Sequence, residues 1–170
     1  TTRHASYTVT LLQRSGSYPA LDGGWISYAE DLVDETGSYF DAPAQRLGYL
    51  QSRALQAARI VADTGVHSQK WSYEQAVDFM TEATGLPKEQ MEEDVLLIAA
   101  WPGLASTPFI GRQQIQRLRE VADRALGPDF DLVAFNGVIL QGGGRSLNIL
   151  EEDINAWVLG RLQFRDNPPS

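Results

Sequence analysis

Apolar residues recur every three or four positions through most of this chain, which is the spacing of amphipathic helices. The pattern predicts seven helices, over residues 25–37, 43–64, 72–85, 87–101, 108–126, 131–140 and 146–162. Residues 1–13 fit either a short strand or the first turns of a helix, and glycine and proline make residues 15–24 a predicted loop. No other stretch favours a sheet. The sequence therefore predicts an all-α fold, a single domain of six to seven helices.

The second predicted helix carries a long apolar stripe at helical spacing. Its members are Leu47, Leu50, Ala54, Ala57, Ala58 and Val61. Alanines in such a stripe allow the close approach of a neighbouring helix. We therefore expect this stripe to be buried in the core.

Composition narrows the class of partner. The formal net charge of −8 argues against nucleic acid, because phosphate binding needs a basic surface. It fits a cytoplasmic protein or one that binds a neutral or cationic ligand. The longest apolar run, residues 95–101, is too short to span a bilayer, so no membrane partner is expected. The chain has no cysteine, which excludes disulfides and thiolate metal sites.

Three residues with possible chemistry follow one another at intervals of four. Arg59, Asp63 and His67 share one face if the helix continues past residue 64. In a functional interpretation, Asp63 orients His67, which acts as a general acid or base. In a structural interpretation, the three form a surface or interhelical ladder at a helix end, and Gly65 ends the helix before His67.

Two segments resemble a known family. Residues 23–30 read Gly-Gly-Trp-Ile-Ser-Tyr-Ala-Glu and are similar to the Glu-Gly-Trp-Ala-Leu-Tyr-Ala-Glu signature of the bacterial domain-of-unknown-function 885 family, which is zinc-peptidase-like and of gluzincin type. Residues 59–67 look like its Arg-Leu-Val-Val-Asp-Thr-Gly-Ile-His segment. Further matches follow in order to about Trp157. The resemblance implies the C-terminal portion of a longer family member, with a variable segment 1–23, a helical core 24–162 and a tail 163–170.

The departures from the family pattern concern its metal site. By resemblance, residues 4–10 correspond to the zinc motif His-Glu-x-x-Pro-Gly-His, yet only His4 survives there, and Gly23 stands where a further glutamate ligand is expected. The Gln and Tyr of a Pro-Gly-Gln-Ala block have become Leu104 and Pro108, and a later histidine is Asn136. Zinc hydrolysis needs three protein ligands and a base. We therefore expect a degenerate site with no metal and no cofactor.

The resemblance also suggests the remaining site residues. It implies His67, Asp63 and Glu30 as candidate catalytic residues, and it implies a substrate cleft lined by His4, Tyr7, Trp25, Tyr28 and Arg59. Each has a plainer interpretation: His4 is a relic, the aromatic residues belong to the core, and Glu30 is a solvated residue on a helix surface.

Three functions remain open. The chain is a metal-independent enzyme of specialised metabolism acting on a small molecule or short peptide, a catalytically inactive protein that binds a ligand or partner, or a subunit that completes a larger peptidase-like hydrolase. A helical domain without the family's N-terminal half would leave apolar faces uncovered, so a homodimer or a partner chain is expected.

Overall fold

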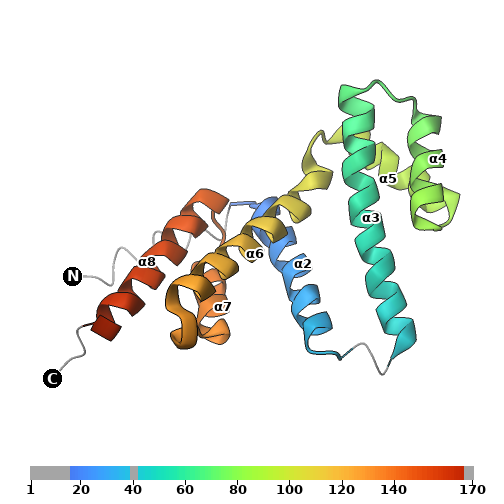
Figure 1. Cartoon of the computed structure of the whole chain (residues 1–170). Helices are drawn as coiled ribbons and strands as arrows, with labels where there is room; N and C mark the ends of the chain where they lie inside the picture. Colours follow the sequence, from blue (N-terminus) through green and yellow to red (C-terminus); the bar gives the residue numbers. More distant parts are fainter. Residues whose placement is uncertain (1–15, 39–41, 167–170) are drawn as a thin grey trace.

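The computed structural model describes residues 16–38 and 42–166, in which helices are joined by short turns and loops (Figure 1). The elements are α2 (Pro19–Glu35), α3 (Pro43–Ser68), α4 (Tyr73–Thr84), α5 (Lys88–Ala100), the 3-10 helix η1 (Leu104–Ser106), α6 (Thr107–Leu126), the 3-10 helix η2 (Gly127–Asp129), α7 (Leu132–Gln141) and α8 (Leu147–Asp166). No strand occurs in the two described ranges. The prediction of an all-α fold is confirmed.

Two apolar cores lie side by side in the molecule. The first joins α2, α6, α7 and α8 around Tyr28, Ile115 and Phe135. The second joins α3, α4 and α5 around Met80 and Met91. In Figure 1 the long helix α6 crosses α2 and leads through η1 to the second group of helices.

Local sequence signals set several helix ends as expected. The Ser72 hydroxyl accepts a hydrogen bond from the Gln75 amide, and the Gln75 side chain accepts one from the Ser72 amide, so the predicted capping box forms. Gly85 follows α4 in the left-handed region, with a φ of 65°. The Asp131 carboxylate accepts hydrogen bonds from the first amides of α7. These ends depend on a few adjacent residues, which is why the sequence shows them.

The start of α2 differs from the prediction. Residues 19–24 of the predicted loop are helical, because α2 begins at Pro19 and contains the Gly23–Gly24 pair. A Cβ on Gly24 would lie 2.5 Å from the Gly111 carbonyl carbon, and one on Gly111 would lie 1.6 Å from the Ala20 carbonyl oxygen. The glycines therefore serve the close crossing of α2 and α6 instead of a turn.

Helix α3 also continues further than predicted. Gly65 does not end it, and His67 lies in its last turn. The ring of Trp71 folds back over Gly65, where a Cβ would come within 2.4 Å of the indole. Gly65 is thus explained by close packing, and Arg59, Asp63 and His67 lie on one continuous helix.

The predicted buried stripe of α3 is wrong for most of its members. Leu47 is 66% exposed, Leu50 is 48% exposed and Val61 is 45% exposed. The buried residues of α3 are Ala58, Ala62, Asp63 and Gly65. The apolar residues do recur at helical spacing, but α4 and α5 pack on the neighbouring face of the helix.

None of the described helices is both long and apolar enough to cross a membrane by itself. Taken together, the consecutive segments Lys88–Ala100 and Leu104–Asp129 are long and apolar enough to do so. The pair is bent by 111° at the break between them.

Candidate functional site

An open apolar groove lies where α3, the end of α5, η1 and the start of α6 meet. We call it the α3–α5–α6 groove; it has a volume of about 340 Å³ and is lined by Arg59, Asp94, Leu97, Ile98, Trp101, Leu104, Ala105 and Pro108. Leu97 and Trp101 are each 62% exposed, and Leu104 is 44% exposed. The volume falls within the range of small-molecule sites, about 300–1,000 Å³, and the lining is mostly apolar, as in such sites.

A single ion pair supplies the polar edge of the groove. The Arg59 guanidinium donates two hydrogen bonds to the Asp94 carboxylate, at 2.8 and 3.0 Å. The Asp94 side chain is 12% exposed and that of Arg59 is 36% exposed. This paired geometry fixes Arg59 at the groove wall, and its role as a substrate-binding residue stays a prediction.

Asp63 and His67, the other two residues in the series on α3, contact the segment that forms this wall. The Asp63 carboxylate accepts a hydrogen bond from the Gly103 amide at 3.1 Å. The His67 Nε2 lies 2.9 Å from the Ile98 carbonyl oxygen and 3.5 Å from Asp63 Oδ1. A carbonyl oxygen only accepts, so Nε2 carries the hydrogen and donates it. Both residues therefore hold the 98–103 segment against α3.

Three of the positions at which this chain departs from the family pattern lie together. Leu104 and Pro108 line the α3–α5–α6 groove. Gly23 is adjacent, because a Cβ there would lie 2.9 Å from the Pro108 Cγ. Three positions for which the resemblance implies polar side chains thus carry uncharged residues that lie together here.

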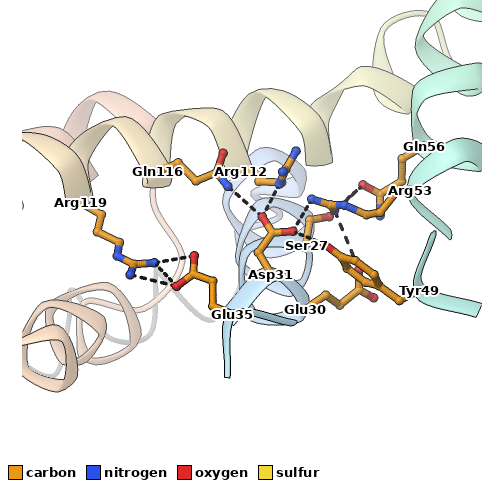
Figure 2. Close-up of polar contacts among 10 residues, drawn as sticks. All are labelled: Ser27, Glu30, Asp31, Glu35, Tyr49, Arg53, Gln56, Arg112, Gln116 and Arg119. Carbon is orange, nitrogen blue, oxygen red and sulfur yellow. Dashed lines mark hydrogen bonds and ion pairs between the residues drawn. The ribbon is translucent and has the colours of Figure 1, made fainter. Parts of the chain in front are cut away.

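Asp31 was missed by sequence analysis, yet it is the most connected carboxylate in the described structure. Figure 2 shows it receiving hydrogen bonds from two elements. From α3, Tyr49 Oη donates at 3.0 Å and Arg53 Nη2 at 2.6 Å. From α6, Gln116 Nε2 donates at 2.8 Å, and Arg112 Nε donates as well. Asp31 therefore joins the two helical groups, since α2 belongs to one core and α3 to the other.

Glu30 lies beside this network but is less tightly held. Its Oε2 atom is buried and has no hydrogen-bond partner among the described residues, and its side chain is 33% exposed. Arg53 Nη1 is 4.0 Å from that oxygen. Of the candidate residues that the structure describes, Arg59 lines the α3–α5–α6 groove, whereas Glu30, Asp63 and His67 do not.

The two aromatic candidates on α2 lie in another part of the molecule. Tyr28 is fully buried in the first core and donates a hydrogen bond from Oη to Asn136 Oδ1 at 3.3 Å. Burial raises its pKa, while the nearby Arg119 guanidinium acts in the opposite direction. Trp25 packs on Tyr28, with ring centroids 5.7 Å apart, and lines a separate hollow with Ile139. Neither lines the α3–α5–α6 groove.

Two further candidates, His4 and Tyr7, lie outside the described residues. Across residues 16–38 and 42–166, no three or more histidine, aspartate or glutamate side chains are placed to hold a metal ion together.

Comparison with known proteins gives the family. A model described as "Bacterial protein of unknown function (DUF885)" matches residues 2–154. The match covers most of the chain, which therefore belongs to the DUF885 family, as the signature around Trp25 predicted. Its zinc-peptidase-like character and the loss of a metal site stay predictions.

A solved structure agrees with the fold. The chain is similar to a protein from Colwellia psychrerythraea described as "the putative lipoprotein", with 36% sequence identity and a TM-score of 0.85. The similarity covers 88% of this chain and 26% of that chain, so this chain spans about a quarter of its relative's length. No curated protein matches.

Proposed function

We propose that this chain binds a small, largely apolar molecule in the α3–α5–α6 groove, and that it does so without a metal ion. The observation that carries the proposal is the clustering of Gly23, Leu104 and Pro108 at that groove. By resemblance, these positions would carry a glutamate, a glutamine and a tyrosine. Their replacement removes polar groups and favours an apolar ligand over a peptide backbone, whose amides need hydrogen-bond partners.

The ligand class follows from the lining. Exposed Leu97, Trp101 and Leu104 offer apolar and aromatic contact surface. The Arg59–Asp94 pair offers one polar edge, where the partly exposed guanidinium can meet an anionic or hydrogen-bond-accepting group. We expect an aromatic or branched apolar molecule that carries one such group.

The position of His67 favours binding without turnover. His67 does not line the α3–α5–α6 groove, and its Nε2 donates to the Ile98 carbonyl, so only Nδ1 is left to take up a proton. A second candidate function, turnover of the bound molecule, is favoured by the 3.5 Å contact of His67 with Asp63. Asparagine at position 67 would keep a donor but cannot act as a base, so a reaction that depends on His67 is lost in His67→Asn while binding is kept.

The test uses 1-anilinonaphthalene-8-sulfonate, an aromatic molecule with one anionic group, and measures its binding by fluorescence titration. Leu104→Gln restores the polar residue that the resemblance implies. It should weaken binding by about fivefold, because about 1 kcal/mol of apolar contact is lost. Leu159→Gln is the matched control, since Leu159 is 58% exposed on α8 and outside the groove. Equal affinities in the two variants would exclude the groove as the site.

The metal-independent part is tested separately. After dialysis against a mild chelator, elemental analysis should find far less than one zinc per chain. A retained one-to-one zinc content would contradict the metal-independent part of the proposal and favour a zinc hydrolase, regardless of the result of the dye titration.

A further inference from the structure

One face of α3 carries an uncharged heptad repeat. We call it the α3 seam; its positions alternate in steps of four and three residues and are Pro43, Leu47, Leu50, Ala54, Ala57, Val61, Thr64 and Ser68. This is the spacing of the contact positions in a two-stranded coiled coil. It extends over the full 26 residues of the helix, about 39 Å at 1.5 Å per residue.

The α3 seam is bare toward the described residues, while the other two sides of the helix are in use. Ala58 and Ala62 pack into the second core with α4 and α5. Tyr49 and Arg53 point to Asp31 of α2. Between these sides, Leu47 is 66% exposed, a fraction that a core residue would not have. A run of exposed apolar residues of this length marks an interaction surface.

We propose that the α3 seam binds the same seam of a second copy of this chain, in antiparallel orientation. The steps along the seam, four-three-four-three-four-three-four, read identically in both directions. When two copies run antiparallel, position n therefore faces position 111 − n throughout. This register places Leu50 against Val61 of the second copy and Ala54 against Ala57, with the small residues at the two-fold axis, where the helices approach most closely.

Charge and shape both fit a second copy as the occupant. The seam contains no charged residue, so two copies meet there without like charges, although the chain carries a net charge of −8. The flanking Arg46 and Arg53 are paired with Asp34 and Asp31. Figure 1 shows α4 and α5 beside the C-terminal half of α3 only, while the N-terminal half extends beyond them. In the antiparallel arrangement, the N-terminal half of α3 in each copy lies beside the C-terminal half of α3 in the other copy.

The expected affinity is modest. One helix from each copy makes an interface smaller than the standard size of about 1,600 Å², so we expect a dissociation constant of about 10 µM. Sedimentation velocity between about 1 and 100 µM should show monomer turning into dimer. Leu50→Glu should be monomeric throughout, and Leu159→Glu, at a more exposed site on α8, should dimerise like the wild type.

Disulfide trapping tests the orientation directly, because the chain has no cysteine of its own. In the antiparallel register, the cysteine of Leu50→Cys in one copy lies opposite the cysteine of Val61→Cys in the other. Two cysteines at the same position in the two copies lie about 16 Å apart along the helix axis, which exceeds the Cα separation of about 7 Å that a disulfide can span. Oxidation of a mixture should give the mixed dimer, identified by mass, and little of either self-dimer. Self-dimers from each variant alone would mean a parallel pair and would overturn the proposed register. A wild-type chain that stays monomeric at 100 µM would overturn the proposal itself.

Discussion

Asp31→Asn is the substitution that most directly tests how the two cores are joined. The Asp31 side chain is 9% exposed and accepts hydrogen bonds from α3 and α6. Asparagine has nearly the same size, so the variant removes a charge without leaving a cavity. It leaves the guanidinium groups of Arg53 and Arg112, whose side chains are 16% and 25% exposed, without their shared carboxylate.

The expected loss in the free energy of unfolding follows from these exposed fractions. Removing one partner of a fully buried ion pair costs about 3–5 kcal/mol. Because both arginines keep some contact with water, we expect the lower end, about 3 kcal/mol. For a chain of this length, each kcal/mol shifts the melting temperature by about 2–4 °C, so the variant should melt about 6–12 °C lower.

Urea denaturation, followed by circular dichroism, measures the change in the free energy of unfolding. Asp78→Asn is the matched control, because its pair with Lys88 is exposed and should contribute less than about 1 kcal/mol. Adding Arg53→Met to Asp31→Asn should recover part of the loss, since one unpaired guanidinium is then gone. A loss in Asp31→Asn no larger than in Asp78→Asn would refute the view that Asp31 joins the two helical groups.

Three further predictions test other parts of the fold. Gly111→Ala should lower the free energy of unfolding by about 3 kcal/mol or more, because its Cβ would overlap the Ala20 carbonyl oxygen. Gly160→Ala is the control: its Cβ would meet no heavy atom of the described neighbours within 4 Å, so it should be neutral or stabilising in the same denaturation assay. Burial raises the pKa of Tyr28 in the folded state. The stability that the neutral Tyr28 side chain contributes is therefore complete below about pH 10 and is lost as the pH rises through the folded-state pKa. The wild type should therefore lose stability above pH 10 more steeply than Tyr28→Phe in thermal melts; parallel curves would contradict this. Ser72→Ala should cost about 1 kcal/mol by loss of the capping box, measured by urea denaturation.

Part of the candidate site could be predicted from the sequence. The spacing of Arg59, Asp63 and His67 placed them on one face, and all three do reach the 94–103 segment. Their assignment as catalytic or substrate-binding residues stays a prediction. Asp31 could not be recognised, because its arginine partners are 22 and 81 residues away along the chain. Only the packing of α2, α3 and α6 brings these charges together.

The sequence by itself determined the fold class, most helix boundaries and the family, because helical periodicity, capping residues and signature segments are local properties of the chain. It left open which face of each helix is covered. The sequence predicts a loop at the Gly23–Gly24 pair, but glycine permits both a turn and a close helix crossing, and Gly111 on the facing helix decides between them. Likewise, the apolar stripe of α3 is plain in the sequence, but its exposure follows from where α4 and α5 pack, and tertiary structure alone decides that.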